Sequence, residues 1–374
     1  MYTRSLEKQI EAWLFKNKVL VLYGARQVGK TTLCQKIIKK YDGLYINCEK
    51  QSVKNLLFAG NPENIKSFIG SSQLVVFDEA QKIKNIGEIL KLFFDTYPKI
   101  QILATGSSSF DLANRASEPL TGRKITFSLY PLSFFELNKQ EDRSVLNDKL
   151  ESFLLYGLYP DIVATASSQE KRVKIDELAG DYLYKDVLEF ENLKKSDLLM
   201  KLLQVLSFQL GSEVSQHELA KTLQTSSETI QRYINLLEKS FVIYRLKSFS
   251  RNLRSELNKK IKVYFFDLGV RNSVIQNFTP LEFRVDIDAI WENFLLNERI
   301  KFLQNKNKIV SQYFWRTYNQ QEIDYIEEAD GKISAYEFKW GSRKKFKKPL
   351  SFLESYESDF KIINRDNFYS FLGS

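Results

Sequence analysis

The segment GARQVGKT, from Gly24 to Thr31, restricts the fold of this chain more than any other stretch of its sequence. It matches the pattern G-x-x-x-x-G-K-[ST], in which a glycine-rich loop joins a buried strand to the start of a helix. The hydrophobic run KVLVLY precedes it, and TTLCQKIIKK follows with Leu33, Ile37 and Ile38 on one side of a helix. Backbone N–H groups of such a loop bind phosphate, so the segment predicts a nucleotide site.

The polar side chains of this loop have separate expected tasks. Lys30 is expected to reach the β- and γ-phosphates, and the hydroxyl of Thr31 is expected to bind magnesium. A plain glycine turn is the competing interpretation, and the strand–loop–helix context argues against it. The nucleotide is expected to contact the loop and the start of its helix, at Gly24, Gln27, Val28, Gly29, Lys30, Thr31 and Thr32.

A second hydrophobic strand, in LVVFDEAQK at residues 74–82, ends in two carboxylates. Asp78 is placed to hold the magnesium ion, and Glu79 to orient or activate the attacking water. The run IQILATG ends near Thr105, whose hydroxyl is expected to sense the γ-phosphate. Expected strands alternate with helices, which predicts a doubly wound parallel sheet. They cover residues 18–23, 44–47, 74–78, 100–105 and 125–129.

The segments GARQVGKTTL, VVFDEAQK, ATGSSS, LTGR and YPLSFFE, in this order, resemble the AAA-type ATPase domain of a large prokaryotic family. Its members carry a C-terminal domain of unknown function, and the resemblance covers nearly the whole chain. It implies that ATP, with Mg²⁺, is bound by Gly29, Lys30, Thr31 and Asp78. It also suggests Arg123, in LTGR, as a sensor or as an arginine finger acting on a neighbouring copy. An ordinary surface arginine is the alternative, and the finger role would require a homo-oligomer.

Residues 161–270 are predicted to be helical and then to form a winged helix. Ser215 with Glu218, and Thr225 with Glu228, have the spacing of capping boxes. The predicted strands FVIYRL and KVYFFD flank the basic segment SFSRNLRSELNKK. A spacer or a protein-contact role is the alternative to nucleic-acid binding. The exposed face of the second helix is expected to be polar but hardly basic, with Ser227, Glu228, Gln231, Arg232 and Asn235.

Positive charge is concentrated in two short segments of a chain whose net charge is +9. Residues 239–262 hold eight basic residues against Glu256 alone, and residues 339–348 hold six with no acidic residue. This concentration favours a polyanion, and nucleic acid, with DNA favoured, is the expected partner. The contacts are expected to go to the phosphate backbone more than to base edges. Two solvated loops are the alternative explanation of the charge.

The segment QQEIDYIEEADGKISAYEFKW contains Asp330-Gly331, a strong signal for a two-residue hairpin turn. With these two residues at the turn, Tyr325 pairs with Tyr336 and Ile323 pairs with Phe338. These four side chains are expected to form one apolar face of the hairpin, because successive side chains of a strand alternate between its two faces.

The other face of this hairpin sets two acids opposite each other. Asp324 is expected to lie opposite Glu337, and Glu322 opposite Lys339. Directly opposed carboxylates cost up to about 1 kcal/mol. A divalent cation between them would make the pair favourable. A solvated sheet edge explains the alternation of side chains but not the opposed acids.

Asp324 followed by Glu337-x-Lys339 resembles the PD-(D/E)-x-K signature of restriction-endonuclease-like nucleases. The resemblance implies that Asp324 and Glu337 hold magnesium and that Lys339 positions or activates the attacking water. Many such proteins add a glutamate from a preceding helix. The segment WENFLLNERIKF offers Glu292 and Glu298, of which the family pattern favours Glu292.

These features together predict an α/β protein in three parts. Residues 1–160 would form a P-loop ATPase with a parallel sheet, residues 161–270 the helical and winged-helix part, and residues 271–374 a restriction-endonuclease-like α/β domain. The leading hypothesis is a DNA-directed ATPase-nuclease that uses ATP and Mg²⁺. Its rival is a nucleotide-switched regulatory or DNA-binding protein whose nuclease-like domain does not cleave. The expected catalytic residues are Glu79, Glu292, Asp324, Glu337 and Lys339.

The expected compartment is a reducing cytoplasm. The two cysteines, Cys34 and Cys48, cannot build a disulfide framework, and one histidine with them cannot complete a zinc site. No apolar run approaches the ~18 residues that a membrane span needs, and the start of the chain lacks a secretory pattern.

Overall fold

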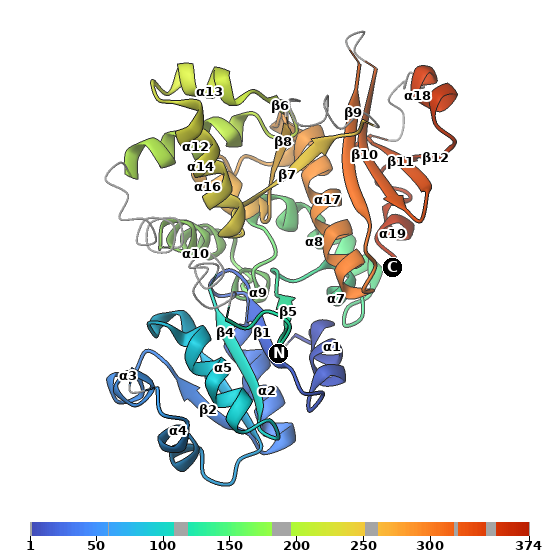
Figure 1. Cartoon of the computed structure of the whole chain (residues 1–374). Helices are drawn as coiled ribbons and strands as arrows, with labels where there is room; N and C mark the ends of the chain where they lie inside the picture. Colours follow the sequence, from blue (N-terminus) through green and yellow to red (C-terminus); the bar gives the residue numbers. More distant parts are fainter. Residues whose placement is uncertain are drawn as a thin grey trace. The chain divides into compact units, whose positions relative to one another are not determined.

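The computed structural model describes residues 2–58, 60–107, 119–181, 196–250, 261–317, 321–341 and 349–373. Figure 1 shows the chain, which divides into two compact units. The first unit runs to Pro131 and also contains residues 239–241, and the second contains most of the chain from Leu132 onward. The expected borders at residues 160/161 and 270/271 therefore differ from this grouping, because both fall inside the second unit.

The first unit is built on a parallel sheet in the order β2-β3-β4-β1-β5. The predicted strands lie within a residue or so of the observed ones. Its strands are β1 (Val19–Tyr23), β2 (Leu44–Asn47), β3 (Leu74–Asp78), β4 (Gln101–Gly106) and β5 (Lys124–Ser128). Its helices are α1 (Leu6–Trp13), α2 (Lys30–Tyr41), α3 (Gln51–Phe58), α4 (Pro62–Ile69), the short η1 (Ala80–Lys82) and α5 (Ile86–Thr96).

Burial explains why the strands of the first unit are so clear in the sequence. Every residue of β1, β3 and β4 is buried, as expected for parallel strands covered on both faces. Strand β4 lies between β1 and β3. The carboxyl end of β4 therefore stands between the loop that follows β1 and the acids that follow β3.

The second unit contains a sheet of seven strands in the order β12-β11-β10-β9-β7-β8-β6. The strands are β6 (Glu213–Val214), β7 (Ile243–Ser248), β8 (Ile261–Phe265), β9 (Ser311–Arg316), β10 (Glu322–Ala329), β11 (Lys332–Phe338) and β12 (Ser358–Ile363). The sheet is mixed, since β7 pairs with β9 in parallel and with β8 in antiparallel orientation.

Helices surround this second sheet (Figure 1). In the first half of the unit they are α7 (Phe134–Leu137), α8 (Arg143–Tyr156), α9 (Pro160–Ala164), α10 (Ser168–Asp181), α12 (Ser196–Phe208), α13 (Gln216–Thr222) and α14 (Ser227–Lys239). In the second half they are α16 (Leu268–Val274), η3 (Leu281–Phe283), α17 (Ile287–Asn305), α18 (Leu350–Ser355) and α19 (Phe368–Phe371). No helix among the described residues combines the length and the apolar character that crossing a membrane requires.

The strands expected to form a separate wing belong to the large sheet. Strands β7 and β8 pair antiparallel, as expected. Strand β7 also pairs in parallel with β9, through Lys247 and Ser248. The backbone groups at this edge of β7 are thus hydrogen-bonded to a strand that was expected to belong to another domain. The basic residues 251–260 of the expected wing lie outside the described residues, as does the cluster at residues 343–348.

The helix pair α13–α14 forms with one change at its second cap. The Ser215 side chain accepts a hydrogen bond from the N–H of Glu218, as predicted. Helix α14 is capped by Ser226, whose hydroxyl accepts from the N–H of Thr229 at 3.2 Å, rather than by Thr225. Both serines supply the oxygen that an N-cap requires, so the helix begins one residue later than expected.

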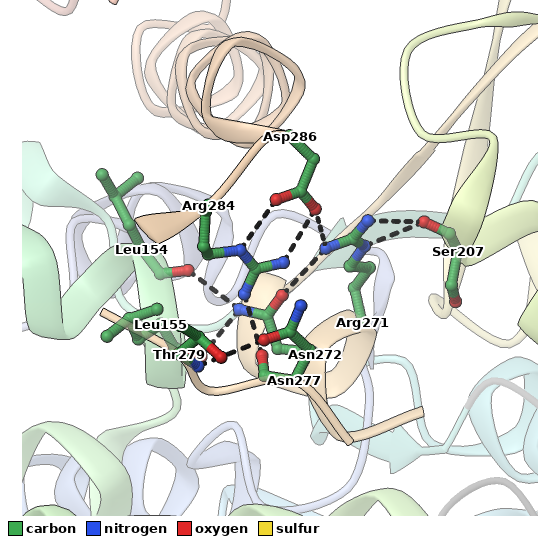
Figure 2. A network of polar contacts seen from close by, with 9 residues as sticks. All are labelled: Leu154, Leu155, Ser207, Arg271, Asn272, Asn277, Thr279, Arg284 and Asp286. Atoms are coloured by element: carbon green, nitrogen blue, oxygen red, sulfur yellow. Dashed lines mark hydrogen bonds and ion pairs between the residues drawn. The ribbon is translucent and has the colours of Figure 1, made fainter. Parts of the chain in front are cut away.

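A buried network of polar groups fixes the start of α17 (Figure 2). Arg271 donates two hydrogen bonds to the carbonyl of Ser207 in α12, at 2.9 and 2.7 Å, and pairs with Asp286 at 2.7 Å. Arg284 pairs with the same carboxylate at 2.7 Å. Burial opposes the charge of Asp286, but Arg284 and Arg271 outweigh it and lower its pKa to about 2. The residue before α17 is therefore anchored by two arginines.

Candidate functional site

The loop after β1 has the backbone that a phosphate-binding loop needs. Gly24 and Gly29 have φ values of 155° and 96°, and Gln27 also has a positive φ of 59°. A Cβ at Gly24 would lie 2.2 Å from the carbonyl oxygen of Leu129, so only glycine fits there. The N-terminus of α2 follows directly, at Lys30. The loop therefore ends in the helix N-terminus that favours an anion.

Lys30 is buried, and its side chain is hydrogen-bonded to the backbone of its own loop. Its ammonium donates to the carbonyls of Gly24 and Ala25, each at 2.8 Å. A second cation braces the loop from outside, because Arg4 donates to the carbonyls of Val28 and Tyr130 at 2.7 and 2.6 Å. Arg4 was not predicted, since nothing in the sequence around it indicates a contact with a distant loop.

The acid at the end of β3 lies beside the threonine of the loop. Thr31 donates a hydrogen bond to Asp78 Oδ2 at 2.8 Å, and Tyr45 donates to the same oxygen at 2.5 Å. Thr105, at the end of β4, donates to Asp78 Oδ1. Thr31 and Asp78 are hard oxygen donors on adjacent elements, so these residues fit a magnesium ion held with a nucleotide. Tyr45 is a contact that the motif does not include.

Glu79 stands at the same edge of the sheet in a left-handed conformation, with φ 55°. Its N–H donates to the Thr105 hydroxyl at 3.1 Å, and its carboxylate accepts from Gln81 Nε2 at 2.5 Å. Gln81 also donates to Ser107 at 3.2 Å. The structure thus brings together Lys30, Thr31, Asp78, Glu79 and Thr105 and adds Gln81 as a side chain that orients Glu79.

Arg123 lies at the other end of the first sheet. It directly precedes β5, whose first residue, Lys124, pairs with Val19, the first residue of β1. The phosphate loop instead follows Tyr23, the last residue of β1. Its side chain is exposed and pairs with Asp95 at 2.8 Å. This position does not favour a sensor role in the same chain, and an action on a neighbouring copy stays a prediction.

The hairpin β10–β11 turns where the sequence predicts. Asp330 and Gly331 have φ values of 50° and 77°, as in a type I′ turn. Tyr325 pairs with Tyr336 in the expected register. Beyond this pair the regular alternation breaks, because β10 contains a bulge between Ile323 and Ile326 against β9.

The bulge changes which side chains share a face. Ile323 packs in one cluster with Ile326 and Phe352, whereas Tyr325 stacks near Tyr336 and Phe338. The expected single apolar face containing both Ile323 and Tyr325 is therefore wrong. An extra residue in one strand moves the following side chains to the opposite side of the sheet.

Asp324 and Glu337 lie close enough for their charges to interact, and each accepts a hydrogen bond from the protein. We call these two residues and the charged side chains around them the acidic region. Asp324 Oδ2 accepts the N–H of Phe338 at 2.8 Å, and Glu337 Oε1 accepts from Lys339 at 2.6 Å. Burial, and then the charge of Asp324, raises the pKa of Glu337 to about 8. Within the described residues, Glu337 Oε2 is buried and has no hydrogen-bond partner.

Glu292, from α17, joins this region, whereas Glu298 does not. Glu292 Oε1 accepts from Lys262 at 3.1 Å and from the hydroxyl of Tyr264. Burial raises the pKa of Glu292 to about 7 against the opposing effect of Lys262. Glu298 instead accepts the N–H of Phe134 and pairs with Lys301 at 2.7 Å.

Lys262, from β8, is the residue of this region that the sequence analysis missed. Its ammonium lies 2.7 Å from Glu322, 3.1 Å from Glu292 and 3.9 Å from Asp324. Its side chain is almost fully buried, at 2% exposure. Burial disfavours its charge, but the surrounding carboxylates outweigh that effect and raise its pKa. Lys262 belongs to the basic segment at residues 239–262, where it was expected to be a surface charge, but it lies in β8 with its side chain buried.

The acidic region is therefore not arranged as an open metal site. Among the described residues, no group of three or more His, Cys, Asp or Glu side chains is placed to hold a metal ion. The nearest cation to Glu292 and Glu322 is the ammonium of Lys262. The acids expected to bind magnesium do not fit that ion as they are arranged here.

Three family models match successive parts of the chain. One described as "AAA domain" matches residues 16–138. Two described as "Domain of unknown function", DUF8612 and DUF4143, match residues 147–281 and 288–370. The N-terminal region is thus similar to a P-loop domain of the AAA ATPase type.

Similar sequences occur in bacteria and archaea. An "Uncharacterized protein" of Mycobacterium tuberculosis is 26% identical over 339 residues, which cover 90% of this chain and 73% of that protein. One of Methanocaldococcus jannaschii is 26% identical over 330 residues, covering 81% and 73%. One of Haemophilus influenzae is 27% identical over 281 residues, covering 69% of each.

Solved structures show more distant likeness. A signal transduction ATPase with numerous domains from Pyrococcus horikoshii is 15% identical, with a TM-score of 0.31 over 82% of this chain and 47% of that chain. A structure of Drosophila ORC bound to AT-rich DNA and Cdc6 is 11% identical, with a TM-score of 0.27 over 73% and 90%. The chain spans about half of the first of these structures.

Proposed function

We propose that this chain is an ATP-hydrolysing AAA-type protein that acts on nucleic acid. The observation that carries the first half of the proposal is the contact between Thr31 and Asp78, next to the buried ammonium of Lys30. These are the side chains that phosphoryl transfer requires at one point, and they come from the start of α2 and the end of β3.

The residues of the first unit have complementary tasks in hydrolysis. The loop N–H groups and Lys30 would hold the phosphates, with Lys30 exchanging its carbonyl partners for phosphate oxygens. Glu79, oriented by Gln81, would accept the proton of the attacking water. Bound magnesium would be held by Thr31 and Asp78 and would neutralise charge on the transferred phosphate.

Nucleic acid is the proposed partner because of the charge pattern. The segments at residues 239–262 and 339–348 concentrate basic residues, which suits a phosphate backbone. On the helix α14, only Arg232 of the five expected face residues is basic, and it is exposed. This surface gives little support to reading base edges.

Cleavage of nucleic acid is the finer proposal for the second unit. Asp324, Glu337 and Lys339 lie together at the end of the hairpin, and one buried oxygen of Glu337 has no hydrogen-bond partner among the described residues. Lys339 would place the attacking water, as the resemblance to PD-(D/E)-x-K nucleases implies. No metal-dependent step is assigned, because the acids do not form an open metal site as arranged.

A second candidate is a nucleotide-switched protein whose nuclease-like part binds without cutting. The burial of Lys262 among Glu292, Glu322 and Asp324 favours it, because an ammonium already neutralises the acids. Both candidates need ATP binding by the first unit, so the difference between them lies only in the chemistry of the second.

One assay separates the two candidates. Supercoiled, linear and single-stranded DNA are incubated with the full chain and Mg²⁺, with and without ATP. The proposal expects cleavage by the wild type and by Lys30→Ala without ATP, and none by Asp324→Asn, which should keep ATP hydrolysis. The absence of cleavage from every DNA form, with intact ATP hydrolysis, would leave the non-cleaving switch.

A further inference from the structure

A tyrosine of the first sheet contacts the acid of the candidate ATP site. Tyr45 lies in β2, which pairs in parallel with β3, and it is in register with Val76, two residues before Asp78. Alternate residues of a strand lie on one face of the sheet, so the side chains of Tyr45 and Asp78 share a face. The tyrosine side chain crosses the roughly 6.6 Å that two residues of a strand span. Its hydroxyl donates a hydrogen bond to Asp78 Oδ2 at 2.5 Å.

The hydrogen bonds to the buried carboxylate of Asp78 are divided unequally between its two oxygens. Oδ2 accepts from Thr31 at 2.8 Å as well as from Tyr45, whereas Oδ1 accepts from Thr105. A carboxylate oxygen has two lone pairs, so the two hydroxyl groups on Oδ2 use both of its acceptor positions. Tyr45 and Thr31 therefore share one oxygen of Asp78, and Thr105 holds the other.

The oxygen that accepts from Thr31 is the one that faces the phosphate loop. A cation held jointly by Thr31 and Asp78, directly or through a water molecule, is expected to interact with this oxygen. That interaction requires a lone pair of Oδ2, and the hydroxyl of Tyr45 uses one of the two. Thr105 makes no such demand, because it donates to Oδ1 from the end of β4. Its hydrogen bond is of the kind that keeps a metal-binding carboxylate oriented.

We propose that Tyr45 competes with a divalent cation for Asp78 Oδ2 and so weakens the dependence of nucleotide binding on Mg²⁺. Tyr45 is a positioning residue: it holds Asp78 beside Thr31, and it gives up this hydrogen bond when the carboxylate interacts with the cation. Thr105 has the opposite effect, since it orients the carboxylate without using Oδ2. The inference rests on the ATP binding proposed above, but it requires neither hydrolysis nor an action on nucleic acid.

The test measures how much Mn²⁺ tightens the binding of a fluorescent ADP analogue to the full chain. ADP is used because it avoids hydrolysis and any contact of Thr105 with a γ-phosphate. For each protein, the Kd in EDTA is divided by the Kd in Mn²⁺, and we call this quotient the metal ratio. Tyr45→Phe removes only the hydroxyl and is expected to raise the metal ratio about tenfold, as the loss of one competing hydrogen bond to a charged group implies. The Kd in EDTA is expected to change little.

Two further variants of the same unit are the controls. Thr105→Val removes the hydrogen bond to Oδ1 and is expected to lower the metal ratio by about tenfold or more. Tyr97→Phe removes a hydroxyl elsewhere, because Tyr97 packs on Phe93 and precedes β4, whereas the candidate site follows that strand. Its metal ratio should equal that of the wild type. The variants of Tyr45 and Thr105 thus alter the same carboxylate and are expected to shift the metal ratio in opposite directions.

The remaining outcomes also decide. An unchanged or lower metal ratio in Tyr45→Phe, whatever its Tm, would show that the hydroxyl only stabilises the fold or supports the cation, and would overturn the proposal. A rise in either control as well would attribute the gain to loosening of the site, and would also overturn it. If Tyr45→Phe does not fold, Tyr45→Met is compared in the same way. If the wild type binds no ADP analogue with or without Mn²⁺, the proposed ATP site is itself wrong and this inference falls with it.

Discussion

Thr31 donates a hydrogen bond to Asp78 Oδ2 at 2.8 Å, so two residues that are 47 positions apart in sequence meet at one edge of the first sheet. The contact joins the phosphate loop after β1 to the acid at the end of β3, although β4 lies between these strands. Thr105 at the end of β4 bonds the other oxygen of the same carboxylate. The carboxyl ends of three parallel strands thus converge on Asp78, which is where nucleotides bind in such sheets.

Substitutions of Lys30 and Glu79 are expected to affect different steps, ATP binding and ATP hydrolysis. Lys30→Ala should abolish ATP binding, because the loop loses its phosphate clamp, whereas Glu79→Gln should keep binding and lose about 100-fold or more in hydrolysis. Fluorescent-nucleotide binding and phosphate release measure the two steps. Hydrolysis by Glu79→Gln at the wild-type rate would show that another group activates the water.

Arg4 is expected to support ATP binding from outside the motif. Its guanidinium holds the carbonyls of Val28 and Tyr130, and each hydrogen bond from a charged donor contributes about 1.5–3 kcal/mol. Arg4→Ala should therefore raise KM for ATP several-fold and lower the free energy of unfolding by a few kcal/mol. Arg4→Lys, which lacks the fork, should show a smaller effect. Unchanged KM and stability in Arg4→Ala would remove this bracing role.

Stability is expected to fall with rising pH because of Glu337. Its pKa is raised from 4.5 to about 8, first by burial, so the folded state binds its proton more tightly than the unfolded state. The associated stability is present at low pH and is lost as pH rises from about 5 through about 8. Urea unfolding of Glu337→Gln should show a flatter pH dependence, because the amide does not ionise.

Glu354 provides the control for this pH dependence, because it is an exposed glutamate of the same unit. Glu354→Gln should change the free energy of unfolding by no more than about 0.5 kcal/mol, as surface substitutions usually do. Its free energy of unfolding should therefore depend on pH between 5 and 8 as that of the wild type does. Identical slopes for wild type, Glu337→Gln and Glu354→Gln would mean that Glu337 titrates as an ordinary exposed acid.

DNA affinity is expected to fall steeply with salt and to vary little with sequence. Each phosphate neutralised on duplex DNA contributes about −0.9 to the slope of log K against log salt. Replacing Arg251, Arg254, Lys259 and Lys260 by alanine should flatten that slope. Fluorescence anisotropy at several salt concentrations measures it, with an Arg232→Ala protein as a comparison on α14. An unchanged slope in the fourfold variant would place the DNA surface elsewhere.

The sequence by itself determined the elements whose signals are local. Strands β1, β3 and β4 of the first sheet are continuous buried runs, and the phosphate loop and the Asp330-Gly331 turn need glycine at defined backbone positions. Hydrophobic burial and left-handed φ values leave their mark within a few residues. For this reason the strands and the hairpin turn, with its pairing as far as Tyr325, could be predicted.

Only the tertiary structure decided which distant side chains meet. Lys262 has the same local signature as a surface lysine, yet the pairing of β7 with β9 places its strand within the large sheet, near Glu322 and Glu292. One extra residue in β10 separates Ile323 from the face of Tyr325. Pairings between segments far apart in sequence follow from the burial of the whole sheet, so a local sequence pattern does not predict them.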